Sequence, residues 1–265
     1  MSPASFVELP GLRMSYALSG PASDPLVVLS HSLGTNLSLW EPQVTALEGR
    51  FRILRYDSRG HGRSSVAPGP YTLEQLGRDV LGLMDALHVA RAHFCGLSVG
   101  GLVGIWLGVH ARERIESLVL ANTAARIGSA AGWNERVETV RGRGIAAIAG
   151  GALERWFTPG FRERSPEVFA AAARMLETTP SEGYLGQCAA IRDADLRAQL
   201  AAIACPTLVI SGARDPATPP EQGRELASGI AGARYVELAA SHLSNLEAAD
   251  AFNAELLSFV GSPRI

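Results

Sequence analysis

Short apolar runs alternate with longer amphipathic segments at both ends of the chain. Leu26–Leu29 is continuously apolar, which is typical of a strand buried on both faces of a parallel sheet. Strands that alternate with helices indicate an α/β fold, with a mostly parallel sheet and helices on both faces. The eight predicted strands are 4–8 and 12–18, paired antiparallel near Pro10-Gly11, then Leu26–Leu29, Phe51–Tyr56, a run ending at Leu97, Ile115–Ala121, Pro206–Ser211 and Ala233–Leu238.

The intervals between these strands carry helical patterns. Thr72 and Gln75 have the spacing of a capping box, which predicts a helix from there to about Leu87. The other helices expected around the strands are Leu37–Leu47, Val99–His110, Pro220–Ile230 and the closing helix Leu246–Val260.

The alternation stops in the middle of the chain, where only helical segments occur. The expected helices there are Trp133–Ile148, Gly151–Trp156, Pro166–Leu176 and Ser181–Ile191. We interpret residues 122–196 as a helical cap inserted over the sheet edge, and residues 1–121 and 197–265 as the core. The alternative is a second independent domain, which is disfavoured because the alternation resumes at once at Pro206.

Composition indicates a compact globular protein, since hydrophobic residues make up 47% and charged residues 19% of the 265 positions. The net charge of -2 predicts no general attraction to nucleic acid or to an anionic membrane. All 24 basic residues are arginine, so a single arginine is weak evidence for an anion site.

Three widely spaced cysteines, Cys95, Cys188 and Cys205, suggest neither a disulfide framework nor a zinc site. The first twenty residues lack a basic start followed by an apolar core, and no apolar run is long enough to span a bilayer. We therefore expect a cytoplasmic protein without a metal site. The sequence leaves the oligomeric state open and is compatible with a homo-oligomer.

The stretch with the clearest chemical potential is Gly96-Leu97-Ser98-Val99-Gly100, which follows an apolar run and precedes a small-residue helical pattern. In a strand-turn-helix of this kind the serine sits on a sharp, strained corner with its hydroxyl exposed. The flanking glycines are needed because a Cβ there would collide with neighbouring chain. The motif alone is weak evidence, and its context has to support it.

Other polar or loop residues follow predicted strands in the same way. Leu33, Asp57 and Asn122 each come just after a strand, as Ser98 does. Ligands of parallel sheets bind beyond the carboxyl ends of the strands. We therefore expect these four residues to lie along one edge of the sheet.

A serine nucleophile needs a base to take its proton and a carboxylate to orient that base. Asp215 and His242 each follow a predicted strand, and the order serine, acid, histidine is one in which this triad occurs. Among the six histidines, His242 alone lies beyond the last strand with a helix after it. The simpler alternatives are that Asp215 starts an Asp-Pro turn and that His242 is an ordinary loop histidine.

The reaction also needs hydrogen-bond donors directed at the developing oxyanion. The backbone N–H of Val99, the residue after the nucleophile, is one candidate. The second is the N–H of Leu33 in the loop His31-Ser32-Leu33-Gly34. The alternative for this loop is a plain glycine turn.

Together these motifs resemble those of the α/β-hydrolase superfamily. The resemblance is carried by Gly96–Gly101, His31–Gly34 and Asp57–Ser64. More narrowly, three stretches are similar to 3-oxoadipate enol-lactonases, and the similarity covers nearly the full chain: Gly183–Asp193, Asp215–Pro220 and His242–Glu247. Ser32 departs from the usual His-Gly pattern, and a serine there would either narrow the oxyanion loop or add a hydroxyl donor.

The resemblance implies hydrolysis of 3-oxoadipate enol-lactone, a small anionic lactone of bacterial aromatic catabolism, without a metal or organic cofactor. It makes Arg192 the first candidate for binding the substrate carboxylate. Arg126, Arg136 and Arg155 compete with it, and Trp133 and Trp156 are candidates for the apolar wall of the pocket. Each of these residues also has an ordinary alternative, a solvated arginine or a core tryptophan.

Three other functions use the same framework. An esterase or perhydrolase would keep the triad with a looser acyl pocket, and a carbon-carbon bond hydrolase would keep it for a dienone substrate. A catalytically idle hydrolase fold could instead be a small-molecule receptor or scaffold. Asp in place of Ser98 would indicate a dehalogenase or an epoxide hydrolase, so those classes are disfavoured.

Overall fold

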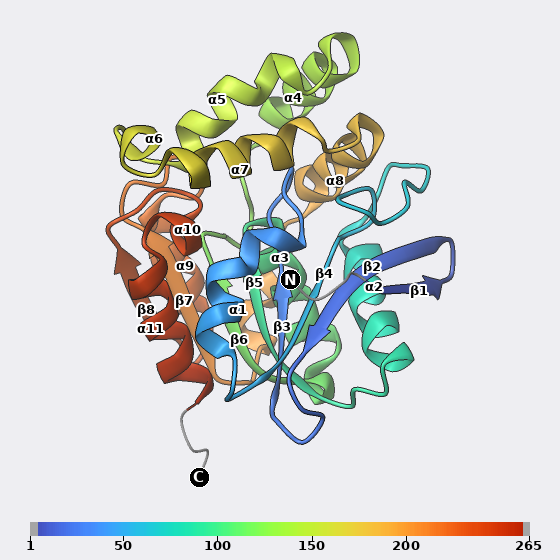
Figure 1. Cartoon of the computed structure of the whole chain (residues 1–265), viewed down its shortest axis with the longest axis vertical. Coiled ribbons are helices and arrows are strands. Elements are labelled where there is room, and N and C mark those ends of the chain that lie inside the picture. The colour runs from blue at the N-terminus through green and yellow to red at the C-terminus, as the bar shows by residue number, and fades with distance from the viewer. Residues whose placement is uncertain (1–4, 262–265) are drawn as a thin grey trace.

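The computed structural model describes residues 5–261, which contain one eight-stranded sheet in the order β1-β2-β4-β3-β5-β6-β7-β8 (Figure 1). The pairs β1–β2 and β2–β4 are antiparallel and all other pairs are parallel. The predicted eight-stranded, mostly parallel α/β sheet is therefore confirmed, while residue 4 lies outside the described residues. The strands are β1 Ser5–Leu9, β2 Leu12–Ser19, β3 Leu26–Ser30, β4 Arg52–Tyr56, β5 Ala92–Leu97, β6 Ile115–Ala121, β7 Thr207–Gly212 and β8 Arg234–Leu238.

The central strands are buried along their whole length because helices cover both faces of the sheet. Every residue of β3, β5 and β7 is buried, and apart from His93 of β5 these residues are apolar or small. In β3, Val28 pairs with Leu54 on one side and with Phe94 on the other. At the carboxyl edge Ser30 pairs with Gly96, which brings the loop after β3 beside the loop after β5.

Helices α1 and α11 contact each other on one side of the sheet, and α3 contacts α2 on the other. The predicted capping box is present: Thr72 Oγ1 accepts the N–H of Gln75 at 3.1 Å, and Gln75 Oε1 accepts the N–H of Thr72 at 3.1 Å. The core helices are α1 Glu41–Leu47, preceded by the 3-10 turn Leu37–Trp40, then α2 Leu73–Ala86, α3 Val99–His110, α9 Pro220–Gly229, α10 Ser244–Glu247 and α11 Ala249–Val260. Two further 3-10 turns span Arg112–Arg114 and Arg197–Ala202.

The helices between β6 and β7 lie across the carboxyl edge of the sheet (Figure 1). We refer to them together as the cap helices. They are α4 Ala130–Arg143, α5 Ala146–Trp156, α6 Phe161–Arg164, α7 Pro166–Glu177 and α8 Ser181–Asp193.

Three helices expected in the second half of the chain have other bounds in the structure. The helix expected over Trp133–Ile148 ends at Arg143, because Gly144 takes a left-handed backbone conformation with φ 73°. The segment Gly151–Trp156 is the second half of α5. The closing helix Leu246–Val260 is divided into α10 and α11 by Ala248, whose φ of -123° and ψ of 47° are not helical.

The loop Asp57–Ser64, one of the stretches that carried the resemblance, holds the cap helix α8 against the core. A Cβ on Gly183 of α8 would lie 1.9 Å from the carbonyl oxygen of Gly60, so the two backbones touch. Tyr71 N–H also donates to Gly186 O at 3.2 Å.

Within residues 5–261 no helix is both long and apolar enough to cross a membrane.

Candidate active site

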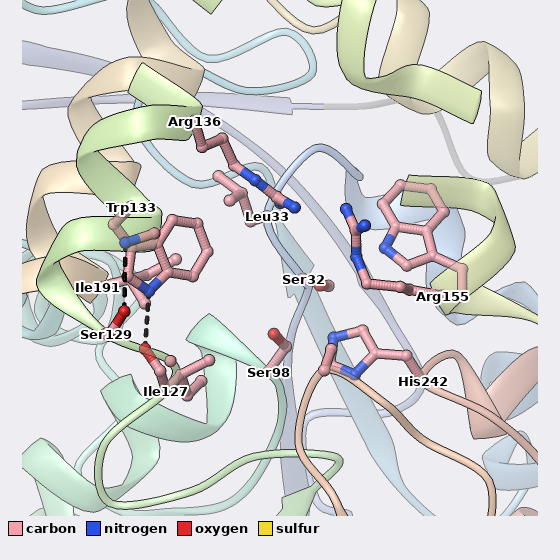
Figure 2. Close-up of a pocket in the computed structure, with 14 residues that line it drawn as sticks. Ser32, Leu33, Ser98, Ile127, Ser129, Trp133, Arg136, Arg155, Ile191 and His242 are labelled. Carbon is pink, nitrogen blue, oxygen red and sulfur yellow. Dashed lines mark hydrogen bonds between the residues drawn. The ribbon is translucent and has the colours of Figure 1, made fainter. Parts of the chain in front are cut away.

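Ser98 occupies the strained corner between β5 and α3. Its φ of 59° and ψ of -115° lie outside the regions that most L-residues adopt. A Cβ on Gly96 would lie 2.1 Å from Gly100 O, and a Cβ on Gly100 would lie 2.3 Å from Ser30 O. The turn therefore requires both glycines, and it lifts the Ser98 side chain into the cavity above the sheet (Figure 2).

Asp215 and His242 meet at the same edge, in the loops after β7 and β8. His242 Nδ1 donates to Asp215 Oδ2 at 2.8 Å, and their side chains are 5% and 0% exposed. The other imidazole nitrogen, Nε2, is thereby left to face the cavity that Ser98 lines. The structure thus brings together the three residues of the triad predicted from the sequence.

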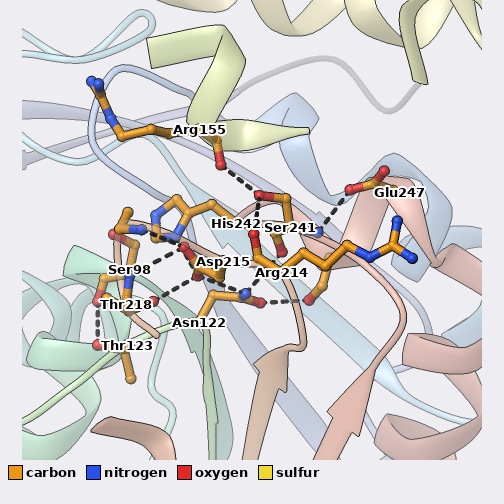
Figure 3. A network of polar contacts seen from close by, with 12 residues as sticks. Ser98, Asn122, Thr123, Arg155, Arg214, Asp215, Thr218, Ser241, His242 and Glu247 are labelled. Carbon is orange, nitrogen blue, oxygen red and sulfur yellow. Dashed lines mark hydrogen bonds and ion pairs between the residues drawn. The ribbon is translucent and has the colours of Figure 1, made fainter. Parts of the chain in front are cut away.

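Two further residues hold the carboxylate of Asp215. Asn122 Nδ2 donates to Asp215 Oδ2 at 3.0 Å, and Thr218 Oγ1 donates to it at 2.7 Å (Figure 3). Burial alone would raise the pKa of Asp215, but the neighbouring His242 charge and these hydrogen bonds hold that pKa below its usual value. Asp215 is therefore ionised at neutral pH and able to stabilise a protonated His242.

Asn122 was expected at the strand edge, but its partners could not be read from the sequence. Its φ of 45° is left-handed, a conformation that Asn tolerates better than most residues. The side chain also donates to Ser241 O at 3.1 Å and accepts the hydroxyl of Ser244. It joins the loop after β6 to the acid and histidine loops.

Leu33 belongs to a loop that two buried histidines hold in place. His31 Nε2 accepts the N–H of Ser58 at 2.9 Å, and His61 Nε2 accepts the N–H of Gly34 at 3.1 Å. Burial lowers the pKa of His31, and burial followed by the charge of His31 lowers the pKa of His61 to about 3. Both rings are neutral at neutral pH, as acceptor roles require.

Of the two predicted oxyanion donors, Leu33 borders the same cavity, and Val99 directly follows Ser98. Leu33 and Val99 follow β3 and β5, neighbouring strands of the sheet. Val99 is the first residue of α3, so its N–H has no intrahelical acceptor. Their role as donors stays a prediction.

A cavity of about 240 Å³ lies between Ser98 and the cap helices. Trp133 borders it and donates from Nε1 to Ile127 O at 2.7 Å, which holds the indole in place. Trp156 borders it as well, so both tryptophans expected at an apolar wall lie there. The core side is formed by Ser32, Leu33, Ser98 and His242, and the cap side includes Trp133, Arg136, Arg155 and Trp156.

Two arginines of the cap helices extend into this cavity. Figure 2 shows the guanidinium groups of Arg136, from α4, and Arg155, from α5, on the cap side above Ser98 and His242. The Arg136 guanidinium lies over the Trp133 ring at 5.2 Å. Burial and the nearby Arg136 charge both lower the pKa of Arg155. The cap side of the cavity is therefore strongly positive and suited to an anion.

Arg192, the first candidate from the resemblance, is not brought to this cavity. It lies in the last turn of α8, where its guanidinium pairs with Asp193 at 2.7 Å and donates to Asn134 Oδ1 at 3.2 Å. These local partners hold it on another surface. Arg126 likewise lies at a separate hollow and pairs with Asp195 at 3.5 Å. Their positions correct the expectation that Arg192 is the anion-binding residue.

Asp57 also lies outside the cavity. Its carboxylate accepts the N–H of Leu37 at 2.8 Å and of Arg63 at 2.9 Å, so it organises two loops of the core.

The part of the chain that the structure describes contains no group of three or more His, Cys, Asp or Glu residues arranged to hold a metal ion.

A family profile described as the alpha/beta hydrolase fold matches residues 25–249. The chain belongs to the α/β hydrolase family. Among the relatives of this hydrolase, 3-oxoadipate enol-lactonase 2 of Acinetobacter baylyi is 45% identical over 242 residues, which cover 91% of each chain. The resemblance drawn from the sequence motifs is thereby confirmed.

Two solved structures of hydrolases are also similar to this chain over nearly its full length. The crystal structure of the enol-lactonase from Burkholderia xenovorans LB400 matches with a TM-score of 0.96 and 51% identity over 97% of this chain and 100% of that one. A hydrolase from Pseudomonas aeruginosa PA01 matches with a TM-score of 0.95 and 52% identity over 98% of each chain.

Proposed function

We propose that this hydrolase opens 3-oxoadipate enol-lactone to 3-oxoadipate, with Ser98 as nucleophile, His242 as base and Asp215 as its carboxylate partner. One observation carries the proposal. Ser98 and His242 line a cavity whose opposite side, formed by the cap helices, has two arginines, and Asp215 is hydrogen-bonded to His242. Two cations do not strengthen the binding of a neutral ester, whereas they form charge-assisted hydrogen bonds with a lactone that has a carboxylate side chain. The names of the relatives point to the same substrate.

In the first half of the reaction, His242 Nε2 takes the proton of Ser98 as its Oγ attacks the lactone carbonyl. Asp215 stabilises the imidazolium that forms, and the N–H groups of Leu33 and Val99 stabilise the oxyanion. The bond between the acyl carbon and the ring oxygen then breaks, and His242 returns its proton to the departing enol oxygen. The leaving group stays attached through the carbon chain of the acyl-enzyme.

In the second half, the enol becomes a ketone, which removes the nucleophile that could close the ring again. His242 then takes a proton from water, whose oxygen attacks the Ser98 ester. As the tetrahedral intermediate collapses, the bond from the acyl carbon to Ser98 Oγ breaks and His242 returns the proton to Oγ. The new carboxylic acid is released and ionises. Each step uses groups of the chain and water. The proposal therefore needs no metal and no organic cofactor.

The carboxylate of the lactone is proposed to bind Arg136 and Arg155, with Trp133 along the ring. These residues come from the proposed cap, residues 122–196, while the triad comes from the proposed core, residues 1–121 and 197–265. Free, buried thiols at Cys95 and Cys188 suit a reducing compartment such as the cytoplasm, which is the proposed location.

Loss of enol-lactone absorbance, followed beside hydrolysis of a neutral aryl ester, tests the proposal. The wild type is expected to turn over the lactone with a much higher kcat/KM than the ester, and Ser98→Ala is expected to lose both activities while keeping its thermal stability. A phosphonate probe should label Ser98 in the wild type. Ester turnover without lactone turnover would instead indicate the broader esterase, and an unlabelled Ser98 would indicate a receptor or scaffold.

A further inference from the structure

Glu247 ends the stretch His242–Glu247, of which the proposed mechanism uses only the histidine. Its side chain is 3% exposed, although it carries a carboxylate. A buried carboxylate is stable only where hydrogen-bond donors surround it. Its donors therefore show what the residue holds together.

The donors come from two distant parts of the chain. Glu247 Oε2 accepts the N–H of Ser241 at 2.8 Å, directly beside His242. The same carboxylate accepts the N–H of Thr158, at 3.1 Å to Oε1 and 3.2 Å to Oε2, and the Thr158 hydroxyl. Arg164, with a side chain 60% exposed, is 3.8 Å away. Glu247 thus joins the histidine loop to the segment that follows α5.

Two more hydrogen bonds run beside this link. Ser241 Oγ donates to Arg155 O at 2.7 Å (Figure 3), and Leu243 N–H donates to Trp156 O at 3.0 Å. His242 lies between the two donors, and Arg155 and Trp156 both border the cavity. The base and one wall of the anion subsite are therefore parts of one hydrogen-bonded unit.

We propose that Glu247 is a positioning residue that sets His242 and Arg155 in one geometry, so that base and substrate carboxylate are aligned together. This inference rests on the proposed function of the site. A carboxylate suits the task because both oxygens accept, and hydrogen bonds to a charged acceptor are about twice as strong as neutral ones. Small displacements matter here, since an error of about 1 Å in a reacting geometry costs on the order of 10²-fold in rate.

Glu247→Gln separates this role from simple packing, because the amide has nearly the same size. One end of the amide is an NH₂ group, which faces the N–H of Ser241 in one orientation and the N–H of Thr158 in the other. Either orientation loosens the link between the two segments.

The test uses two aryl esters with the same leaving group, a neutral butyrate and a hemiglutarate that carries a carboxylate. Rates are normalised to active sites counted with the phosphonate probe, and melting temperatures are measured. The matched control is Glu255→Gln on α11, since Glu255 pairs with Arg234 at the surface at 3.4 Å. Lactone turnover is recorded in parallel, so that failure of the proposed function shows separately as a wild type inactive on the lactone.

For Glu247→Gln we expect kcat to fall about tenfold on both esters, which corresponds to about 1.4 kcal/mol of barrier. We also expect KM to rise severalfold for the hemiglutarate alone, with Glu255→Gln unchanged. Unchanged constants per active site, even with a lowered melting temperature, would overturn the proposal and leave Glu247 a structural role. A fall in kcat with an unmoved hemiglutarate KM would overturn the coupling to Arg155.

Thr158→Val keeps the proposal testable if Glu247→Gln fails to fold. It removes one donor from the cap side of the carboxylate and keeps the buried charge in place. We expect it to raise the hemiglutarate KM more than it lowers kcat. Equal constants for this variant and the wild type would contradict the proposed link.

Discussion

Replacing Asp215 by Asn tests whether the carboxylate sets the proton position on His242. The wild-type carboxylate accepts five hydrogen bonds, two on Oδ1 and three on Oδ2. Those on Oδ1 come from the N–H groups of Ala217 at 2.8 Å and Thr218 at 3.1 Å. Those on Oδ2 come from Asn122, Thr218 and His242, at 3.0, 2.7 and 2.8 Å.

An asparagine has two ways to fit this site. If its oxygen stays with the N–H groups of Ala217 and Thr218, its NH₂ group faces His242 Nδ1. That nitrogen must then accept, the proton moves to Nε2, and the ring cannot take the Ser98 proton. If the amide is reversed, the histidine is correct but two buried backbone N–H groups lose their acceptor, at about 1–3 kcal/mol each.

The reversed amide therefore costs roughly 2–6 kcal/mol in total, and at about 4 kcal/mol only on the order of one molecule in 10³ is in the active form. The imidazolium also loses its negative neighbour. We expect kcat of Asp215→Asn to fall about 10³- to 10⁴-fold.

Stopped-flow or steady-state assays of lactone and aryl ester measure this fall, with thermal unfolding as the check of folding. Thr218→Val is the matched control, because it removes one donor to the same carboxylate without changing the tautomer. It should stay within about tenfold of the wild type, since one hydrogen bond to a charged group contributes about 1.5–3 kcal/mol to stability and only part of that reaches the barrier. More than a hundredth of wild-type kcat in Asp215→Asn would refute the tautomer argument.

Two further predictions follow from the charges of the site. Arg136→Gln and Arg155→Gln should each raise KM for the anionic lactone about tenfold or more and leave KM for a neutral aryl ester unchanged, whereas Arg192→Gln should change neither. If the three substitutions changed KM for the lactone equally, the proposed anion subsite would be contradicted. Because the folded-state pKa of Asp215 is lowered, its ionisation stabilises the fold above the unfolded pKa of about 3.9 and this stability is lost as pH falls through the folded pKa. Urea unfolding from about pH 5 to about pH 2 should therefore show a steeper loss of stability for the wild type than for Asp215→Asn, and parallel curves over this range would refute the expected contribution of Asp215.

The chain order of strands and helices was readable from local pattern, because strands such as β3 are uninterrupted apolar runs and α2 begins with a capping box. The capping box at Thr72 and the strand-to-helix turn at Ser98 need only neighbouring residues to form. The predicted helix boundaries were wrong where a helix ends through a change of backbone conformation that no side chain signals. Gly144 was one glycine among many, and Ala248 carries no sequence signal for the break between α10 and α11.

The triad could be predicted because each member follows a strand whose end lies on the same edge. The anion subsite could not be predicted in this way. Whether an arginine of the cap reaches the cavity depends on how its helix is rotated against its neighbours, and 24 arginines gave the sequence no means of choosing. Packing of the cap helices turns Arg136 and Arg155 toward Ser98 and leaves Arg192 with Asp193.

By itself the sequence determined the α/β alternation, the serine on its strained turn, and the order of serine, acid and histidine. These depend on backbone periodicity and on the shared edge of parallel strands, both of which are local rules. Only the tertiary structure decided which arginines face Ser98, and that the carboxylate of Glu247 joins the loop of His242 to Thr158. Contacts of that kind join segments far apart in the chain, and their geometry exists only once the helices have packed.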